Sequence, residues 1–449
     1  MMNSRLSLFS IVFGLLSWVS VAQAIDLKGA PKLQDIADQL IAEQHYTQAE
    51  LDAIFAKATV QQSVIDAMSN PAEYRLTWGK YRKIFLGEER IQQGVEFWRE
   101  YQDDLARAEK EYGVPANIIV AIIGVETKFG RIKGKHKVLD SLVSLVVGYP
   151  RRSAFFAKEL KHFLILTKEN QMNADEILGS YAGAVGYPQF ISSSYRSYAV
   201  DFSGDGKADL IDEPVDAIGS VANYFIENGW KPGEAVTSEQ HVSISNELKE
   251  LANRKRKTRF SAKELRSKGA NIAGSVPDTE SLNVLMLDAS EVVPDSKEKG
   301  IYIVRAGDTA CQIAERHDVA CNSLFSLNKL NKDGKIFRGQ RLKLPVSVKE
   351  NSTASAKKTV VKSGKWTVVD SAKGGSPNTD STSSKKSGGQ ADGSSSDGSS
   401  KPRYFYTHHN FYAITKYNHS VLYAMAVYDL SVAIANAKQQ ADNLNASSF

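Results

Sequence analysis

The fold is set by the stretch Pro115-Ala-Asn-Ile-Ile-Val-Ala-Ile-Ile-Gly-Val-Glu126, which is apolar at most positions before its last residue. Proline is tolerated in the first turn of a helix, so the stretch predicts a helix that begins near Pro115 and is buried along its length. Helical patterns also fill residues 31–110, where Thr47 and Glu50 form a capping box ahead of apolar residues at helical spacing. The first part of the chain therefore predicts a mainly helical body.

Glu126 stands at the end of this apolar helix. It follows isoleucines by three, four and seven residues and so shares their buried face. Apolar surroundings disfavour the charged form of a carboxyl group and raise its pKa, which is what a general acid near neutral pH requires. Glu126 is therefore a candidate catalytic acid. The alternative is a carboxylate that reaches solvent at the helix end and pairs with Lys128 or Arg131.

Length and composition limit the possible classes of protein. A chain of 449 residues suggests two to four domains, at roughly 100–200 residues each. With 42% hydrophobic and 24% charged residues, the chain is neither collagen, nor wholly disordered, nor a polytopic membrane protein. Two cysteines exclude a disulfide scaffold and a Cys-rich zinc array. The net charge of +5 is too small to predict nucleic-acid binding, and the basic residues near 254–268 suit either a solvated helix face or an anionic polymer.

The N-terminus is typical of a secretory signal. Arg5 precedes the apolar stretch Leu6–Val21, and Ala22-Gln23-Ala24 matches the small-x-small pattern of a cleavage site. A permanent membrane anchor is the alternative, but the apolar core is shorter than the ~20 residues that a spanning helix needs. No cysteine follows for lipid attachment, and no later segment is apolar enough to span a bilayer. We expect residues 1–24 to be removed, leaving a soluble periplasmic protein without a lipid anchor.

A second informative segment is Gly179-Ser-Tyr-Ala-Gly-Ala-Val-Gly-Tyr-Pro-Gln-Phe190. Its glycines let a ligand approach the backbone, and its tyrosines offer flat apolar faces with a polar rim, a surface suited to sugars. A tight turn between helices is the alternative, and it accounts for the glycines but not for Ser180, Gln189 and the tyrosines together. The segment therefore indicates a sugar-binding loop.

A cation-binding loop is indicated by Asp201-Phe-Ser-Gly-Asp-Gly-Lys-Ala-Asp209, which follows the D-x-S-x-D-G pattern. Oxygen ligands at positions 1, 3, 5, 7 and 9, with glycine at position 6, suit a hard cation such as Ca²⁺. Asp212 stands at position twelve, where a bidentate glutamate is usual. The alternative is a solvated acidic turn.

Several longer motifs extend these segments. They are Gly124-Val-Glu-Thr-Lys-Phe-Gly130, Tyr149-Pro-Arg-Arg152, Ser180 to Phe190, Asp201 to Gly206, Asp216-Ala-Ile-Gly-Ser-Val-Ala-Asn-Tyr-Phe225, Asn410-Phe-Tyr-Ala-Ile-Thr-Lys-Tyr-Asn-His-Ser420 and Tyr423-Ala-Met-Ala-Val427. Together they resemble the membrane-bound lytic murein transglycosylase B family, over residues 30–300 and 403–440. The resemblance implies a lysozyme-like, mainly helical catalytic domain that acts on the glycan strands of peptidoglycan as a monomer.

The resemblance also implies residue roles. The family's single catalytic acid falls on Glu126. Its sugar-groove residues fall on Tyr81, Ser180, Gln189, Tyr224, Tyr417, Asn418 and Tyr423. Its cation loop falls on Asp201, Ser203, Asp205, the carbonyl of Lys207 and Asp209, with Asp212 and Asp216 as rivals for the closing ligand. Structural Ca²⁺ or Na⁺ is expected there, and no cofactor is expected for catalysis.

The chemistry implied is a route with one acid, whereas most glycosidases use two carboxylates. Glu126 would protonate the oxygen of the β1,4 bond between N-acetylmuramic acid and N-acetylglucosamine, while the 2-acetamido group of the substrate stabilises the positive charge. Glu126 would then deprotonate the muramyl 6-hydroxyl, which closes on C1 and leaves a 1,6-anhydro end without consuming water. A glycan-binding scaffold with an inert Glu126 and a hydrolysing muramidase are the alternatives.

A small module follows at residues 301–346, where a strand, two helices and a closing strand are predicted. This βααβ order resembles a LysM domain, with marks at Gly307-Asp-Thr309, Asn328, Gly339-Gln340 and Leu344-Pro345. The resemblance implies binding to glycans that contain N-acetylglucosamine, in a groove near Gly307, Asp308, Thr309 and Ile336. A small core without a ligand is the alternative.

Cys311 and Cys321 both lie in this module, ten residues apart and near the starts of its two helices. A disulfide there would stabilise a domain too small for a large core. Two buried thiols are the alternative. A metal site is not expected, because His317 is the one nearby histidine and the ligand spacing is wrong.

The remaining chain divides by composition. Residues 371–400 hold 11 Ser and 6 Gly, so they cannot bury enough apolar surface to offset the entropy of ordering. Trp366 marks a short apolar island nearby for which we have no account. The predicted order is a signal peptide (1–24), the first part of the catalytic domain (25–300), the LysM domain (301–346), a disordered Ser/Gly/Lys-rich linker (347–402) and a helical C-terminal part of the catalytic domain (403–440).

Overall fold

The computed structural model describes residues 27–69, 76–239, 244–253, 255–288, 301–304, 308–317, 319–330, 334, 336, 340–344 and 402–446. The chain forms two compact units: unit 1 is Met1–Val293 with Ser400–Phe449, and unit 2 is Pro294–Ser399. The predicted signal peptide, Trp366 and nearly all of the predicted linker lie outside the described residues.

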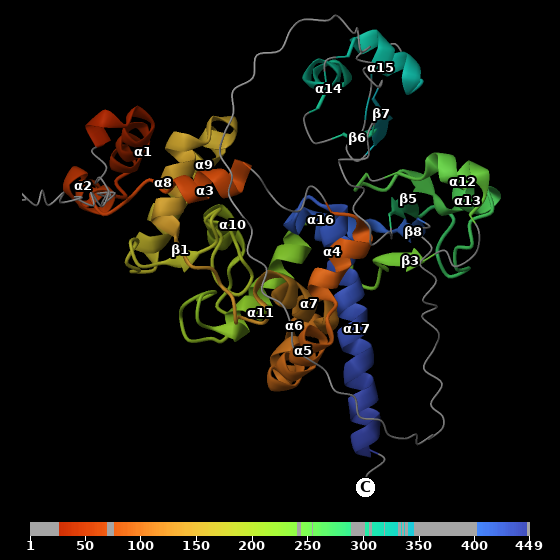
Figure 1. Cartoon of the computed structure of the whole chain (residues 1–449). Helices are drawn as coiled ribbons and strands as arrows, with labels where there is room; N and C mark the ends of the chain where they lie inside the picture. The colour runs from red at the N-terminus through yellow and green to blue at the C-terminus, as the bar shows by residue number, and fades with distance from the viewer. Residues whose placement is uncertain are drawn as a thin grey trace, which may run out of the picture. The chain divides into compact units, whose positions relative to one another are not determined.

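Unit 1 is mainly helical, as expected (Figure 1). Its first helices are α1 (Pro31–Ala42), α2 (Gln48–Phe55), α3 (Gln62–Ser69), α4 (Trp78–Phe85), α5 (Glu88–Glu100) and α6 (Gln102–Tyr112). They are followed by α7 (Ala116–Thr127), α8 (Val138–Gly148), α9 (Ser153–Glu169), α10 (Ser192–Tyr198) and α11 (Pro214–Glu227). Two short helices, α12 (Asn246–Leu251) and α13 (Ala262–Ser267), precede the tail helices α16 (His409–Tyr417) and α17 (Val421–Ala446).

Unit 1 also contains a four-stranded antiparallel sheet that the sequence did not predict. Its order is β3-β8-β5-β4, with β3 at Thr237–Glu239, β8 at Arg403–Thr407, β5 at Ser281–Leu287 and β4 at Phe260–Ser261. The C-terminal part of the chain, 403–440, was predicted to be helical, which is wrong for β8. Five residues rich in aromatics are a weak signal beside the long helical pattern that follows them.

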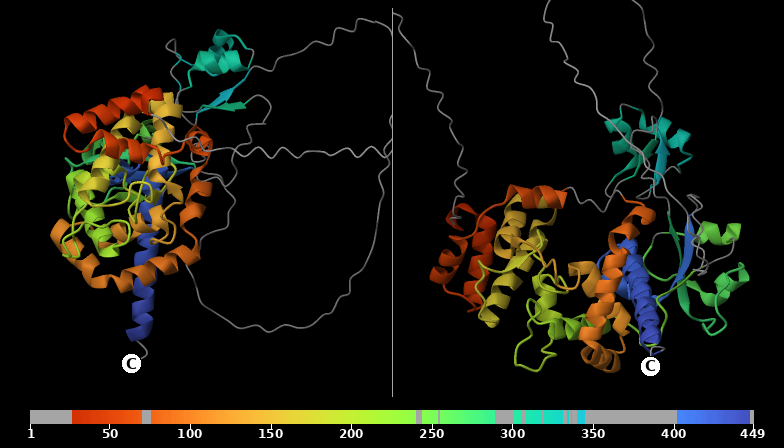
Figure 2. Two further views of the ribbon diagram at one scale, coloured as in Figure 1. Left: turned by 90° about the vertical axis from the view of Figure 1, so that its left-hand side faces the viewer. Right: turned by 60° about the horizontal axis from the view of Figure 1, so that its bottom comes forward.

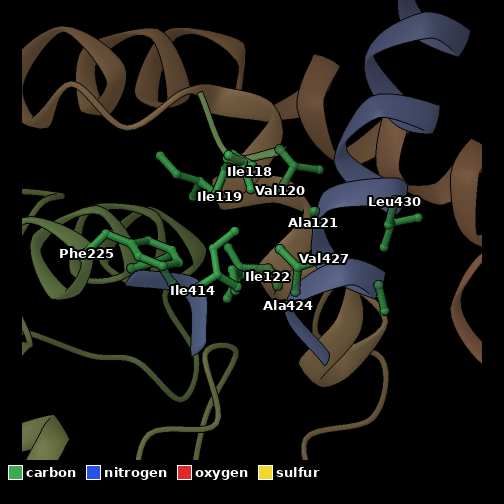
Figure 3. Close-up of a cluster of buried hydrophobic side chains, with 14 of the residues drawn as sticks. Ile118, Ile119, Val120, Ala121, Ile122, Phe225, Ile414, Ala424, Val427 and Leu430 are labelled. Carbon is green, nitrogen blue, oxygen red and sulfur yellow. The ribbon is translucent and has the colours of Figure 1, made fainter. Parts of the chain in front are cut away.

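The helix predicted from the apolar stretch is α7, and it lies at the centre of the larger core of unit 1 (Figure 3). Its residues from Ile118 to Ile123 are at most 2% exposed. They pack with Phe225 of α11, with Ile414 of α16 and with Ala424, Val427 and Leu430 of α17. The core thus joins segments from both ends of the chain.

α17 is the element that packs the C-terminal tail against the earlier helices of unit 1. It packs against α4, α5 and α7, and the views in Figures 1 and 2 show it running beside them. In the described part of the chain, no helix by itself has the length and apolar character needed to cross a membrane. α16 and α17 meet both criteria only as a pair bent by 109°.

A second core of unit 1 lies between α1–α3 and α8–α10. The predicted capping box is confirmed there: the Thr47 N–H donates to Oε2 of Glu50 at 2.7 Å, and the Glu50 N–H donates to Oγ1 of Thr47 at 3.3 Å. A two-stranded ribbon, β1 (His136–Lys137) with β2 (Leu178–Gly179), precedes the loop that leads to α10.

The basic segment near residue 260 is solvated at Lys255, Lys257, Arg259 and Lys263, whereas Arg266 is partly buried. Arg266 of α13 donates to Oδ1 of Asp278 at 2.5 Å and to the carbonyl oxygens of Ala273 and Val276 at 2.6 Å each. Its guanidinium group therefore fastens the loop that follows α13, and this cation is used within the protein.

Unit 2 has the order β6 (Ile301–Ile303), α14 (Ala310–Arg316), α15 (Cys321–Leu327) and β7 (Arg341–Lys343), with β6 antiparallel to β7. Thr309 caps α14. The Asn328 side chain exchanges two hydrogen bonds with the backbone of Lys343, at 2.6 and 2.7 Å. A disulfide joins Cys311 to Cys321, whose Cα atoms are 4.8 Å apart.

Candidate active site

Glu126 is the penultimate residue of α7, and it is partly exposed although the helix before it is buried. The helix ends because Lys128 and Phe129 both adopt left-handed backbone angles, with φ of 50° and 60°. Side chains disfavour this conformation, so other contacts must hold it. Phe129 is 7% exposed, and its ring centroid lies 5.6 Å from that of Phe97. Burial of this ring fixes the turn that brings Glu126 to the protein surface.

Thr127 connects this turn to the segment predicted to bind sugar. Its Oγ1 lies 3.0 Å from the carbonyl oxygen of Tyr187 and 3.1 Å from that of Ile123, and it accepts the Gly130 N–H at 3.0 Å. Gly130 has φ of +82°, and a Cβ there would collide with the Tyr187 ring. Glycine is therefore required at the end of the Gly124–Gly130 motif so that Tyr187 can lie against it.

Tyr423 of α17 contacts Glu126 directly. The Tyr423 hydroxyl donates to Oε1 of Glu126 at 2.5 Å, and the Tyr423 side chain is 2% exposed. Burial, and then the nearby negative charge of Glu126, raise the pKa of Tyr423 well above its usual value. A raised pKa keeps the phenol neutral, so Tyr423 remains a hydrogen-bond donor that fixes the orientation of the Glu126 carboxyl group. Arg131, one of the cations considered as a partner, pairs with Glu96 at 3.7 Å.

Aromatic rings form the wall behind this contact. Tyr417 stacks on Tyr423 with centroids 6.4 Å apart and planes 13° apart, and its ring lies 4.8 Å from that of Tyr224. Its hydroxyl donates to the carbonyl oxygen of Pro188 at 2.7 Å, next to Gln189. Tyr81, Tyr224 and Tyr423 are buried, whereas Tyr417 is partly exposed. The buried tyrosines therefore support the site, and Tyr417 lies nearer to solvent.

Ser180 and Gln189 shape the loop between β2 and α10. Oγ of Ser180 accepts the N–H groups of Ala182 and Ala184 at 3.3 and 3.0 Å. Gln189 has φ of 49°, and its Nε2 donates to the carbonyl oxygens of Lys133 and Gly186, each at 3.0 Å. Both side chains are partly exposed, as is Asn418 at the end of α16.

The predicted cation loop gathers acidic side chains before α11. Asp201, Asp205 and Asp216 can each offer an oxygen within 4.8 Å of the others. Asp216 is fully buried and accepts the N–H groups of Phe202, Ser203 and Asp209 at 2.7–2.8 Å. Desolvation opposes the charge on Asp201, but the N–H groups of Gly206, Gly204 and Asp205 keep the pKa of Asp201 below its usual value. These carboxylate oxygens are the ligands that a hard cation prefers.

The other predicted loop residues have different neighbours. Asp212 is 78% exposed in its side chain and pairs with Lys133 at 3.1 Å. Asp209 accepts the N–H groups of Ile211 and Asp212. Ser203 donates to Asp201 at 3.3 Å, and the Lys207 N–H donates to Asp205 at 2.9 Å. Of the two rivals for the closing position, Asp216 lies in the acidic cluster.

Sequence reasoning missed Thr127 and Lys133. Thr127 carries a local signal, because a hydroxyl that follows the last buried helical turn can bond the carbonyl four residues back. Lys133 carries no such signal, since its partners Ile211 and Asp212 are 78 and 79 residues away.

A hollow of about 510 Å³ lies elsewhere in unit 1, between α4, α17 and the strands β3 and β8. Arg82, Arg403, Tyr428 and Asp429 are among its lining residues. It includes none of the predicted site residues and is separate from Glu126.

The family model described as "Transglycosylase SLT domain" matches residues 28–306 and 323–432. Among characterised relatives, the membrane-bound lytic murein transglycosylase B of Escherichia coli (strain K12) is 40% identical over 272 residues, which are 59% of this chain and 74% of the relative.

Solved structures of lytic transglycosylases are also similar to this chain. Soluble lytic transglycosylase SltB1 from Pseudomonas aeruginosa superposes with a TM-score of 0.63 and 32% identity, covering 91% of this chain and 100% of that chain. The Escherichia coli lytic transglycosylase Slt35 in complex with calcium superposes with a TM-score of 0.60 and 30% identity, covering 94% of this chain and 98% of that chain.

The substitution Asp216→Asn tests whether the buried carboxylate organises the acidic loop without help from an ion. One carboxylate oxygen becomes an NH₂ group and leaves N–H donors unsatisfied, so the free energy of unfolding should fall by about 1–3 kcal/mol. Thermal unfolding in the presence of a chelator measures the change. Asp212→Asn is the matched control, expected to cost less than about 1 kcal/mol because that aspartate is exposed. Equal effects of the two variants would contradict this role for Asp216.

Proposed function

Since the chain belongs to the transglycosylase SLT domain family and is a peptidoglycan lytic transglycosylase, we propose that Glu126 is its single catalytic acid. The hydrogen bond from Tyr423 to Oε1 of Glu126 carries the proposal, because it orients the carboxyl group. Substrate-positioning groups held in this way can supply several kcal/mol of transition-state stabilisation. The position of the partly exposed Glu126 at the end of a buried helix further supports the assignment.

The proposed reaction uses Glu126 twice. Glu126 first protonates the oxygen between N-acetylmuramic acid and N-acetylglucosamine, while the substrate's 2-acetamido group stabilises the positive charge at C1. Glu126 is then a carboxylate and removes the proton of the muramyl 6-hydroxyl as that oxygen closes on C1. The products are an N-acetylglucosamine end and a 1,6-anhydro-N-acetylmuramic acid end, and Glu126 is again protonated. No cofactor takes part in this route.

The sugar-binding surface is proposed to involve the loop 179–190 and the partly exposed Tyr417 and Asn418. Tyr417 is anchored to this loop by its hydrogen bond to the Pro188 carbonyl, so ring and loop form one wall. Tyr224 supports that wall, because its ring lies 4.8 Å from that of Tyr417. Tyr81 and Tyr224 are both buried and remain proposed members of the groove. Exposed tyrosine faces and amide groups are the contacts that sugars favour.

The acidic loop is proposed to hold a structural Ca²⁺ ion, or Na⁺, through Asp201, Asp205 and Asp216, with Ser203, Asp209 and the Lys207 carbonyl as further oxygen ligands. The closeness of three carboxylate oxygens supports this, as does the calcium complex of the relative Slt35. When bound, such an ion neutralises the clustered negative charge and so holds the loop before α11 in one conformation.

Unit 2 is proposed to be a LysM domain that binds peptidoglycan glycans. Its βααβ order, the clamp from Asn328 to β7 and the disulfide support a small, rigid binding module. The proposed groove includes Asp308, Thr309 and Ile336, while Gly307 lies outside the described residues. A tethered binding module raises the local concentration of glycan at the catalytic groove.

We further propose a periplasmic location and action as a monomer. The apolar N-terminal stretch with its small-x-small site supports export, and the disulfide suits an oxidising compartment. The term membrane-bound is part of the name of the relative transglycosylase B.

Glu126→Gln should lower the cleavage of purified sacculi by about 10²–10⁴-fold, because a glutamine can neither donate nor accept the transferred proton. Mass spectrometry of the wild-type digest should show muropeptides that end in an anhydro ring, one water lighter than reducing ends. Glu96→Gln removes an exposed carboxylate on another helix and should leave cleavage unchanged. Reducing ends would indicate a hydrolase, and no soluble product would indicate a glycan-binding scaffold.

Ca²⁺ should raise the thermal midpoint of the wild type and should do so less in Asp205→Asn. An ion that binds only the folded state at 100 times its Kd stabilises by about 2.7 kcal/mol. Asp175→Asn, which alters an ion pair with Lys57, should keep the full Ca²⁺ response. A midpoint that depends on ionic strength but not on the choice of Ca²⁺ or Na⁺ would argue against the site.

Ile336→Ala should weaken retention on sacculi by roughly threefold to tenfold, because it removes apolar contact area from the proposed groove. Co-sedimentation in the Glu126→Gln background measures retention without cleavage. Leu327→Ala changes an exposed apolar side chain of the same unit and should have no effect. Equal retention of Ile336→Ala and its parent would contradict a glycan groove at this position.

A further inference from the structure

Lys133 lies in the loop between α7 and β1, and no predicted role was given to it. Its ammonium group donates to the carbonyl oxygen of Ile211 at 2.6 Å and to Oδ1 of Asp212 at 3.1 Å. The Lys133 side chain is 30% exposed, so most of it is covered by these neighbours. The contacts connect the turn after Glu126 to the segment that leaves the acidic loop.

The same residue contacts the proposed sugar-binding loop on its other side. Nε2 of Gln189 donates to the Lys133 carbonyl oxygen at 3.0 Å, and Nζ of Lys133 lies 5.0 Å from the centroid of the Tyr187 ring. Gln189 and Tyr187 are both partly exposed. A cation near a tyrosine face is attracted by the electrons of the ring, which restrains both groups.

The segment around Leu210 closes this set of contacts. The Tyr187 N–H donates to the Leu210 carbonyl oxygen at 2.9 Å. Gly186 has φ of +73°, and a Cβ there would collide with the same carbonyl group. The loops after α7, after β2 and before α11 therefore contact one another at this place. The Lys133 ammonium group bonds to the segment before α11 and lies beside the Tyr187 ring of the loop after β2.

We propose that Lys133 is a positioning residue that sets the orientation of Tyr187 and Gln189 for the glycan. The proposal rests on the proposed function of the 179–190 loop. Without the ammonium group, the bond to Ile211 is lost and the Tyr187 ring loses its cation. The loop after α7 is then no longer held against residues 210–212, so Gln189 no longer has a fixed carbonyl partner.

Cleavage kinetics on soluble glycan strands test this proposal. Lys133→Met keeps the aliphatic stem but removes the charge and the donors, and it should raise KM about tenfold while kcat changes by less than about threefold. Lys133→Arg restores a cationic donor and should return KM to within about twofold of the wild type. Asp212→Asn should change KM by less than about threefold, because the bond to Ile211 remains.

Lys57→Met is the matched control, since Lys57 also forms a 3.0 Å pair with an aspartate between two loops but lies in another part of unit 1. A second readout is the side-chain amide resonance of Gln189 in protein labelled with ¹⁵N-glutamine, assigned by its loss in Gln189→Glu. This resonance should shift in Lys133→Met and recover in Lys133→Arg.

These experiments distinguish a failure of the proposed function from a failure of the role proposed for Lys133. If the wild type releases no anhydro products, the proposed function fails. If the wild type is active and Lys133→Met has the KM and the Gln189 resonance of the wild type, only the role of Lys133 is overturned. A thermal midpoint that falls in Lys133→Met, with a KM that Lys133→Arg does not rescue, would also overturn it in favour of a structural role.

Discussion

Packing of α17 against α7 is the constraint on which the rest of unit 1 depends. The two helices lie far apart in the sequence, at Ala116–Thr127 and Val421–Ala446, yet Ala424, Val427 and Leu430 complete the core around the isoleucines of α7. An apolar helix with buried residues on all sides cannot be covered by its sequence neighbours alone. The same contact brings Tyr423 to Glu126, a hydrogen bond between residues 297 positions apart. The packing of α17 against α7 therefore both stabilises the core of unit 1 and sets the orientation of the Glu126 carboxyl group.

The turn after α7 positions Glu126 in the candidate site. Two residues with left-handed backbone angles end the helix, and Phe129 holds them by burying its ring. Thr127 then bonds to the Tyr187 carbonyl, so the end of the helix and the loop 179–190 share one network. A buried helix, a buried turn and a polar bridge together leave the Glu126 carboxyl group few orientations, which is the preorganisation that the proposed proton transfer needs.

The sequence predicted the parts whose signals are local. The helix α7 follows from its apolar run, the capping box at Thr47 from a four-residue pattern, and the mainly helical fold from repeated spacing. The strand β8 was missed because its partners β3 and β5 come from distant segments, and pairing rather than propensity stabilises a strand. Asp212 and Asp216 could not be separated by spacing, because their difference lies in the backbone N–H groups that surround Asp216. The burial of Tyr81 and Tyr224 likewise depends on how helices pack against one another, which sequence patterns do not show.

The pairing of β5 with β8 has a consequence for how this protein tolerates change. The last residue of β5, Leu287, stands opposite the first residue of β8, Arg403. The 115 residues between them, 288–402, therefore leave and re-enter unit 1 at neighbouring points, as the loop of a β-hairpin does. The entropy of closing such a loop grows only slowly with its length. This end of the β5–β8 pair is thus a natural graft site, where whole modules can be exchanged, lengthened or deleted over evolution while the rest of unit 1 keeps its own fold.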